Sequence, residues 1–263
     1  EYDGSSWTAT PALTVAKYWS AQAGTTAAAA AFGGVGTPGN GTLYSSATEE
    51  WNGSSWSIAP GAMPATKIEQ GGAGTQTAAL SITGLADPYT MSNTCFEYDG
   101  TSWTNGGSAT YYRYVAAGAG TQTAAMQMGG YSNPGPGPYG PAPFSPDADA
   151  RTCEFYDGEA WTNGASLLEA QSGSSGGAGT QSDAMLVAGG ISGTPASTVC
   201  QRYDGTAFST SPALNTGRFN AGGSGTDATA AYVVGGNTPG LTDSTEQFTD
   251  AVTTLTAKTI TSS

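Results

Sequence analysis

The feature that most constrains the fold is a seven-residue motif that occurs five times along the chain. It is Glu-Tyr-Asp-Gly-Ser-Ser-Trp at residues 1–7, related copies occupy residues 50–56, 97–103, 155–161 and 202–208, and a worn copy occupies 247–253. The last aromatic residues of the five copies are 49, 47, 58 and 47 residues apart, and they are Trp7, Trp56, Trp103, Trp161 and Phe208. A period of this length, built from short strands, predicts the blades of a β-propeller.

A second repeated motif divides each copy into strands. Residues 22–34, 72–84, 118–130, 177–190 and 223–236 each contain a run of small residues, a Gly-Thr turn and a more apolar stretch that ends in a glycine pair, which is Thr83–Gly84 in the second copy. We name the small-residue strand A and the apolar strand B; strand C ends at the aromatic of the first motif, and strand D begins at its Trp. Small side chains suit strands that crowd around a propeller axis. The Asp-Gly or Asn-Gly pair between strands C and D predicts a hairpin turn with positive φ at the glycine.

These motifs resemble those of kelch-repeat β-propellers, over essentially the whole chain. That family has an apolar strand ending in Gly-Gly, then a Tyr, then a Trp about half a dozen residues later, and often a basic residue before strand A. Here a basic residue stands seven positions before the glycine of the Gly-Thr turn in four copies, with Ser172 in the remaining one: Lys17, Lys67, Arg113 and Arg218. The phrases GAGTQTAA and EYDGSSWT are similar to those of kelch-like proteins encoded by marine bacteriophages, which are regarded as tail or fibre components.

We therefore predict an all-β fold, a kelch-like β-propeller of four-stranded antiparallel blades, with five complete blades plus the outer pair of a sixth. The single domain spans 1–263, with an outer strand pair at 1–13 and repeats at about 14–63, 64–109, 110–168, 169–214 and 215–263. The outer pair has no inner pair before it. Either the inner strands of a sixth position lie upstream of residue 1, which we favour, or another subunit completes it. Because residue 1 is not Met and opens in mid-repeat, we expect a processed product or a fragment.

Composition argues against several classes of function. The net charge is −13 with 10% charged residues, whereas nucleic-acid binding needs basic patches. No apolar run is long enough to span a membrane, so we expect no membrane insertion. The absence of histidine excludes Ser-His-Asp and Cys-His catalysis and His-based metal sites. Asp87, Asp147, Asp149 and Asp243 lie in the variable loops, but nothing in their spacing pairs them as a glycosidase requires. We predict no catalytic residues, no metal and no cofactor.

Three cysteines occupy equivalent places in successive copies. Cys95, Cys153 and Cys200 each lie three residues before the Tyr of the first motif, and Thr48 and Thr245 replace them in other copies. Bridged cysteines need Cα atoms within about 7 Å, which neighbouring blades do not favour. We predict three free, buried thiols that fill space in strand C.

Candidate binding residues lie on the face that carries the B–C and D–A connections. The B–C loops vary in length, at 35–45, 85–94, 131–150, 191–198 and 237–243, and the third is long and rich in proline. Long loops in a compact domain are usually functional or disordered. Tyr131, Tyr139 and Phe144 are therefore candidate contacts with a ligand or neighbouring subunit, and a solvated flap is the alternative.

The basic residues Lys17, Lys67, Arg113 and Arg218 lie near the same face. They are candidate contacts for an acidic sugar or a partner carboxylate. The alternative is a structural role, in which they hydrogen-bond loop carbonyls or pair with strand-C residues such as Glu50, Glu97 or Glu154.

Together with the family resemblance, these features predict a non-enzymatic protein of a phage virion, in a tail, fibre or surface appendage. The expected partners are other virion or surface proteins and a host glycan or receptor, with oligomer formation possible. The expected location is the virion or the extracellular space. A secreted bacterial surface adhesion module is the alternative, and a glycan-active enzyme is the third hypothesis. Fold alone does not decide among them.

Overall fold

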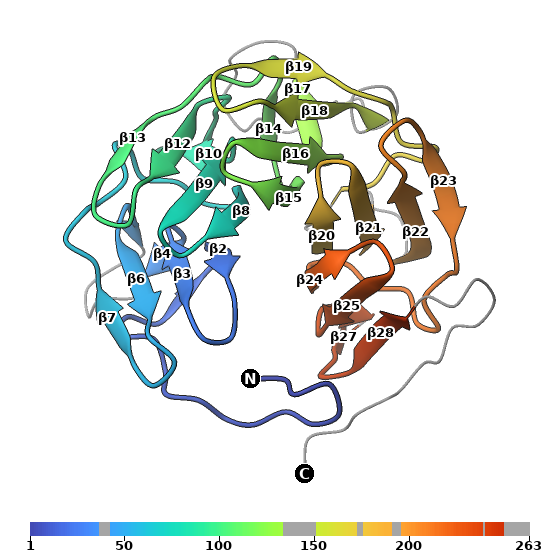
Figure 1. Cartoon of the computed structure of the whole chain (residues 1–263), viewed down its shortest axis with the longest axis horizontal. Helices are drawn as coiled ribbons and strands as arrows, with labels where there is room; N and C mark the ends of the chain where they lie inside the picture. The colour runs from blue at the N-terminus through green and yellow to red at the C-terminus, as the bar shows by residue number, and fades with distance from the viewer. Residues whose placement is uncertain (37–42, 134–150, 173–175, 191–195, 239, 250–263) are drawn as a thin grey trace.

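The computed structural model describes residues 1–36, 43–133, 151–172, 176–190, 196–238 and 240–249. Figure 1 shows five small antiparallel sheets arranged in a ring, which is the arrangement of a β-propeller. Four sheets have four strands in the described part, and the fifth has three. The residues expected to form strand D of the fifth blade lie outside the described part.

Within each blade the strands are neighbours in chain order, from the inner strand to the outer strand, and each is antiparallel to the next. The strands of the five blades are β2 (Ala21–Gly24), β3 (Ala29–Phe32), β6 (Thr48–Trp51) and β7 (Trp56–Ile58); β8 (Gly71–Thr75), β9 (Ala78–Ile82), β12 (Cys95–Tyr98) and β13 (Trp103–Asn105); β15 (Ala117–Thr121), β16 (Ala124–Met128), β18 (Cys153–Tyr156) and β19 (Trp161–Asn163); β20 (Gly176–Thr180), β21 (Asp183–Gly189), β22 (Ser197–Tyr203) and β23 (Phe208–Ser211); and β24 (Gly222–Asp227), β25 (Ala230–Val234) and β28 (Thr245–Thr249).

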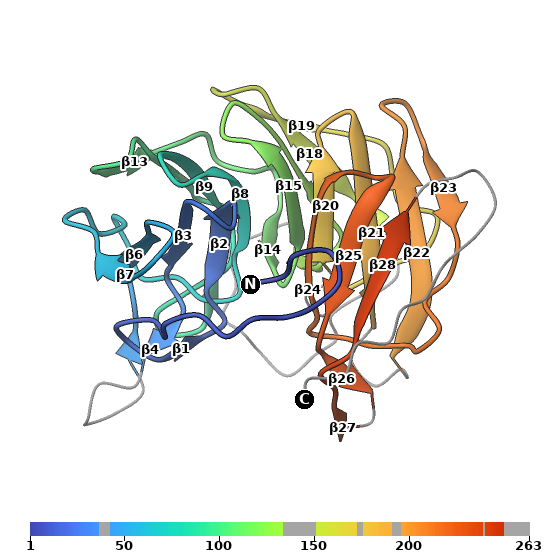
Figure 2. The same cartoon turned by 60° about the horizontal axis from the view of Figure 1, so that its bottom comes forward.

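A second layer of very short strands lies on one face of the ring. Figure 2 shows two of its sheets, β1/β4 and β26/β27, below the blades. The short strands pair the D–A connection with the B–C loop or pair the two arms of that loop: β1 (Lys17–Tyr18), β4 (Val35–Gly36), β5 (Leu43–Tyr44), β10 (Leu85–Ala86), β11 (Thr90–Met91), β14 (Tyr112–Tyr114), β17 (Tyr131–Asn133), β26 (Asn237–Thr238) and β27 (Gly240–Leu241). The repeat pattern did not predict this layer.

The C–D turns confirm the positive φ predicted at their glycines but are longer than a two-residue hairpin. Strand pairing closes at Tyr98 and Trp103, which leaves a four-residue loop. Gly100 has φ +89°, and a carboxylate oxygen of Asp99 accepts the amides of Thr101 and Ser102 at 2.8 and 2.7 Å. These amide hydrogen bonds hold the pKa of Asp99 below its usual range. The Asp of the motif therefore stabilises the loop through hydrogen bonds from its side chain, in addition to being a residue type that turns favour.

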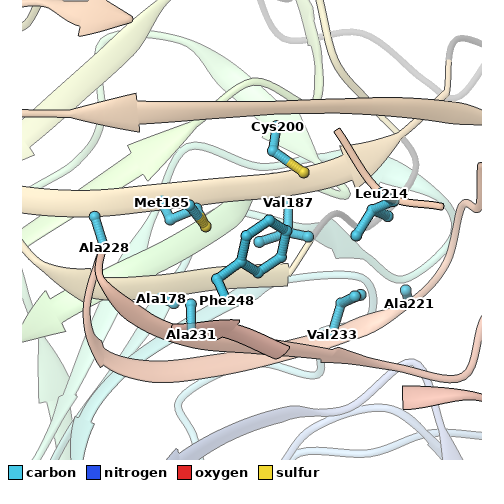
Figure 3. Packing of buried hydrophobic residues seen from close by; sticks show 10 residues of the cluster. All are labelled: Ala178, Met185, Val187, Cys200, Leu214, Ala221, Ala228, Ala231, Val233 and Phe248. Carbon is cyan, nitrogen blue, oxygen red and sulfur yellow. The ribbon is translucent and has the colours of Figure 1, made fainter. Parts of the chain in front are cut away.

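The core consists of layers between neighbouring blades. Figure 3 shows the layer between the fourth and fifth blades, where Met185, Val187 and Cys200 face Val233 and Phe248. Each of these five side chains is at most 5% exposed. The three cysteines are free and buried, which confirms the prediction from their repeat position.

Glutamine side chains join consecutive blades through main-chain carbonyls. Gln76 Nε2 donates to the carbonyls of Ala29 and Trp51 in the preceding blade, at 3.1 and 2.6 Å. Gln122 and Gln181 make the equivalent pairs of bonds in the next two blades. The Gln side chain of each GTQ turn thus holds its blade against the preceding blade.

Residues 1–8 lie beside the fifth blade, in the break in the ring between the fifth and first blades (Figures 1 and 2). Trp7 Nε1 donates to Thr245 Oγ1 at 3.0 Å, just as Trp103 Nε1 of the second blade donates to Thr48 Oγ1 of the first at 2.8 Å. The N-terminal hairpin, bridged at Tyr2 and Trp7, therefore contacts the fifth blade as an outer strand pair contacts the blade before it.

Candidate functional site

The four basic residues of the repeat are buried beneath the face with the B–C loops. Lys67, Arg113 and Arg218 are 0% exposed, and the side chain of Lys17 is 1% exposed. Arg113 Nη1 donates to the carbonyls of Gly129 and Thr152, at 2.7 and 3.0 Å, so the guanidinium fastens the two ends of the B–C loop. Arg218 does the same with Gly235 and Ser244. These side chains hold the bases of the loops and are not presented to solvent.

Each basic residue is matched to the residue that follows Thr or Cys in strand C of its own blade. Lys17 pairs with Glu49 at 2.8 Å, Arg113 with Glu154 at 3.3 Å and Arg218 with Glu246 at 2.6 Å. Burial alone would raise the pKa of Glu49, but the hydrogen bond and charge of Lys17 outweigh burial and lower it.

The two remaining blades depart from this pair in different ways. In the second blade the basic residue is kept but Phe96 replaces Glu, and Lys67 Nζ lies 4.5 Å from its ring centroid while donating to the carbonyls of Thr83 and Thr94. In the fourth blade both members change: Ser172 donates to Gly190 O, and Gln201 donates to Glu169 O and to Gln171 Oε1.

Of the acidic partners expected from the sequence, the structure places only Glu154 in such a pair. Glu50 and Glu97 lie one register position further along strand C, and accept hydrogen bonds from the hydroxyls of Tyr98 and Tyr156 at 2.9 and 2.7 Å. Alternation along a strand sends neighbouring side chains to opposite faces, so the adjacent Glu49 and Glu246 are the partners that the sequence reasoning missed. The joint replacement of the basic residue by Ser172 and of Glu by Gln201 in the fourth blade is the signal that could have found them.

Burial of the basic residues makes the surface strongly acidic. Four of the seven basic side chains are used inside the fold. Among the described residues, the basic side chains that reach solvent are Arg151 and, in part, Arg202, which pairs with Asp183 at 3.3 Å. The described surface is therefore poorly suited to an anionic ligand, and the buried basic ring does not reach solvent to bind an acidic sugar.

Of the three loop aromatics, only Tyr131 lies in the described part; Tyr139 and Phe144 lie outside it. Tyr131 is half-buried and stacks on Tyr114 with a centroid distance of 5.1 Å. Both belong to a separate apolar cluster under the small sheets, together with Val35, Ile68, Leu85, Met91, Val115, Tyr44 and Tyr112. Tyr131 thus has a packing role in the loop layer.

One backbone position at the start of each inner strand is left-handed in four blades. Its occupants are Trp19, Glu69, Val115 and Asn220, with φ between 49° and 57°. A non-glycine residue there costs on the order of 1 kcal/mol or more, so the surroundings must hold it. Glu69 N donates to Trp19 O at 3.0 Å, and Val115 N donates to Glu69 O at 2.9 Å. These bonds fix the backbone of Trp19 relative to that of Glu69.

Exposed aromatics and carboxylates gather around this position in the first two blades. Of the exposed aromatic residues, Tyr18, Trp19 and Tyr89 belong to connections on this face, and each is 45–46% exposed; the aliphatic Leu241 of β27, on the same face, is 91% exposed. Tyr18 and Trp19 form one edge-to-face ring pair at 4.8 Å, and Tyr44 and Tyr89 form another at 5.2 Å. With the carboxylates described next, they define the aromatic–acidic site: Tyr18, Trp19, Tyr44, Glu69, Asp87 and Tyr89.

Two carboxylates belong to this part of the loop layer. The amide of Glu69 donates to Trp19 O, and Asp87 stands two residues before Tyr89, whose ring contacts that of Tyr44. Burial raises the pKa of Tyr44, and a hydrogen bond with Tyr89 and the charges of Tyr89, Asp87 and Glu69 raise it further. Burial also raises the pKa of Glu69 to about 7. Within the described residues, no hydrogen bond or ion pair reaches the Glu69 carboxylate. The site therefore combines aromatic rings with a carboxylate that lacks a counter-ion.

Sequence reasoning did not single out the aromatics and Glu69 of this site. They come from four different connections and share no motif, and Asp87 was noted only for lying in a variable loop. The signal in the sequence is the position two residues after the basic residue of the repeat, where successive copies carry the unrelated residues Trp19, Glu69, Val115 and Asn220.

Other chemistry is limited in the described residues. No group of three or more Cys, Asp or Glu side chains there could hold a metal ion. The same part of the chain has no helix long and apolar enough to cross a membrane.

Comparison with known proteins supports the architecture. No protein-family model matches the sequence, and no curated protein matches it. Among solved structures, the one described as "Structure of YjhT" superposes with a TM-score of 0.69 at 14% identity, over 92% of this chain and 84% of the other. At this identity the likeness concerns the fold alone.

Proposed function

We propose that this chain is a non-enzymatic binding protein of a phage virion, a kelch-type propeller in a tail, fibre or surface appendage, and that it attaches to a host glycan or receptor. The observation that carries the proposal is the aromatic–acidic site, where three exposed rings stand on a rigid backbone. Exposed aromatic groups gathered on one face mark interaction sites, and aromatic residues dominate binding energy at such sites.

The rest of the chain supports binding over catalysis. Histidine is absent, and no catalytic constellation was found in the sequence. Glu69 and Asp87 are the two carboxylates of this site, but a glycosidase would need an acid and a base that flank a substrate cleft. The uniform C–D turns of the opposite face suit a structural role there.

The proposal is tested with purified protein and with virions. Trp19→Ala and Tyr89→Ala should each lower binding to host cells at least tenfold while leaving thermal unfolding unchanged. Ile58→Ala is the matched control, because Ile58 is 57% exposed but lies on the outer strand β7. Unchanged binding by both aromatic variants would refute the site.

A separate readout tests the location. Mass spectrometry of purified virions should detect the chain; detection on bacterial cells that carry no phage would instead favour a secreted adhesion module. Release of sugar from oligosaccharides incubated with the protein would contradict the non-enzymatic assignment.

A further inference from the structure

The charge of the aromatic–acidic site selects among ligands. Glu69 is half-buried, and desolvation of its carboxylate is not offset by any basic group. The nearest basic residue in sequence, Lys67, is buried and donates to the carbonyls of Thr83 and Thr94. Asp87 is exposed and stands two residues before Tyr89, whose ring contacts that of Tyr44, so it adds a second negative charge on this face. A ligand that brings a positive charge would therefore find an unmatched carboxylate.

The rings of the site complement the same kind of ligand. Aromatic faces attract cations placed within about 6 Å of the ring centroid. Tyr44 and Tyr89 lie edge to face with an interplanar angle of 89°, and Tyr18 and Trp19 form a second pair at 70°. Aromatic faces also stack on the apolar faces of sugar rings. A sugar that carries an ammonium group satisfies both the rings and the carboxylates.

Resting on the function proposed above, we propose that the aromatic–acidic site binds an amino sugar, with its protonated amine placed at Glu69 and Asp87 and its ring against the aromatic side chains. Acidic sugars are disfavoured because they meet the two carboxylates and no accessible basic group within the described part of this site.

The test compares two oligosaccharides that differ only in N-acetylation. Isothermal titration calorimetry at pH 7.5, above the pKa of about 7 to which burial raises Glu69, should show that glucosamine oligomers bind at least tenfold more tightly than N-acetylglucosamine oligomers of equal length. Glu69→Gln should remove that preference, whereas Glu159→Gln, in an exposed C–D turn, should keep it. Equal affinities for the two oligomers, absent binding of both, or an unaltered preference in Glu69→Gln would overturn the ligand class. If Trp19→Ala still weakens attachment to cells in that case, the proposed function stands and only the ligand is wrong.

A different observation concerns the break in the ring. In successive blades, the inner strands pack through a glycine whose added Cβ would collide with the backbone of the preceding inner strand. The distances are 2.4 Å for Gly72 to Gln22 O, 2.5 Å for Gly118 to Gly72 O and 2.2 Å for Gly177 to Gly118 O. The equivalent residue in the first blade is Gln22, and it is exposed. An inner strand packed there at the usual distance would collide with the Gln22 side chain.

The opposite side of the break also departs from the repeat. Ser224 of the fifth blade stands where the other blades have alanine, at Ala23, Ala73, Ala119 and Ala178. Its cross-strand neighbour Tyr232 stands where the other blades have apolar residues, at Ala30, Leu80, Met126 and Met185. Polar or amphipathic residues thus appear on both sides of the break.

We infer that residues 1–8 close the outer half of the sixth position, and that the inner half, between β24 and β2, holds no inner strand pair packed as in the other blades. Trp7 makes the closing contact, through its bond to Thr245 and through Tyr2, whose ring lies 6.1 Å from that of Tyr232.

Thiol labelling tests this inference, because the three native cysteines are buried. Cysteine introduced by Gln22→Cys or Ser224→Cys should react with a maleimide in the native protein at least a hundredfold faster than cysteine introduced by Ala119→Cys, which occupies the position of Ser224 in the third blade. If cysteine at either position 22 or position 224 is as protected as at 119, the inner half is occupied and the inference fails. Ala73→Cys serves as a second buried reference if Ala119→Cys does not fold.

Discussion

Replacing Cys95 by Thr should stabilise the protein, because it would supply an acceptor for a buried indole. Trp103 Nε1 donates to Thr48 Oγ1, and Trp7 Nε1 donates to Thr245 Oγ1. At the corresponding place between the second and third blades, Cys95 occupies the Thr position, and Trp161 Nε1 is buried with no acceptor among the described residues. The chain therefore contains one interblade contact in which the donor is present and its acceptor is missing.

The expected magnitude follows from the cost of that missing bond. An unsatisfied buried donor costs roughly 1–3 kcal/mol, and a typical hydrogen bond contributes about 1 kcal/mol net. The new hydroxyl can donate to Asn93 O, which Cys95 Sγ already contacts at 3.9 Å. Allowing for the cost of burying a hydroxyl, we expect Cys95→Thr to raise the free energy of unfolding by about 1 kcal/mol.

Cys153→Thr is the matched control, since the equivalent neighbour is Phe208, which has no donor. The added hydroxyl gains nothing from that ring and should lower the free energy of unfolding by about 1 kcal/mol. For a domain of this size, the two variants should differ in Tm by about 4–8 °C. Urea titration followed by tryptophan fluorescence and differential scanning calorimetry measure both values. The reasoning is refuted if the two variants shift stability in the same direction by similar amounts.

Three further predictions concern stability. Gly100→Val should lower the free energy of unfolding by roughly 1–3 kcal/mol in urea titration, because φ is +89° and the new Cβ would lie 3.2 Å from Thr77 Cβ; a neutral result would contradict the turn geometry. Arg113→Met should cost about 3–5 kcal/mol by leaving the buried Glu154 carboxylate without a counter-ion, although the hydrogen bonds from Thr110 and Gln127 remain. Lys67→Met should cost about 1–3 kcal/mol, because it leaves carbonyls but no carboxylate without their donor. Equal losses would contradict the matched-pair interpretation. Because burial raises the pKa of Glu69 to about 7, this carboxyl loses its proton at lower pH in the unfolded state than in the folded state, so it lowers the free energy of unfolding progressively as pH rises from about 4.5 to 7. Glu69→Gln should therefore raise Tm relative to wild type at pH 8 and leave Tm unchanged at pH 4. The same difference in Tm at both pH values would contradict the raised pKa.

The sequence predicted those features of the fold that repeat. The turn glycines, the free thiols at Cys95, Cys153 and Cys200 and the order of strands within each blade all follow from residues that recur at fixed spacing. The small sheets did not follow, since their strands have two or three residues and pair through loops of differing sequence. Backbone pairing of this kind depends on where the blades place the loop ends, which a local pattern does not encode.

The candidate site was predicted less well than the fold. The basic residues were correctly placed near the variable face, but their depth was not evident from the sequence. A Lys or Arg in a repeat looks the same whether it clamps a loop or contacts a ligand. Arg113 is buried because two loop carbonyls and Glu154 together satisfy its guanidinium, and these partners come from distant parts of the chain. Tertiary partners of this kind decide whether a charged residue lies inside or outside.

Departures from the repeat fall into three physical kinds, and only one of them points to a ligand. Where Glu is lost in strand C, the change is accommodated inside the blade, as where Phe96 replaces Glu and its ring lies 4.5 Å from Lys67 Nζ. Where Gln22 and Ser224 replace small apolar or glycine residues, the departure matches exposure at the break in the ring. The left-handed position differs, because its backbone is fixed by hydrogen bonds whichever side chain it bears.

That freedom explains why the proposed site lies at the left-handed position. The neighbouring blade satisfies the main chain there, so the side chain can vary without disturbing the blade's strand ladder. Copies of the repeat accordingly carry Trp19, Glu69, Val115 and Asn220, of which Val115 is buried in the apolar cluster of the loop layer. Trp19 and Glu69 are adjacent along this chain of bonds, and they are the pair around which the exposed rings and the unpaired carboxylate gather. A position that is rigid in its backbone and free in its side chain holds a binding group in place with little further loss of entropy when a ligand arrives.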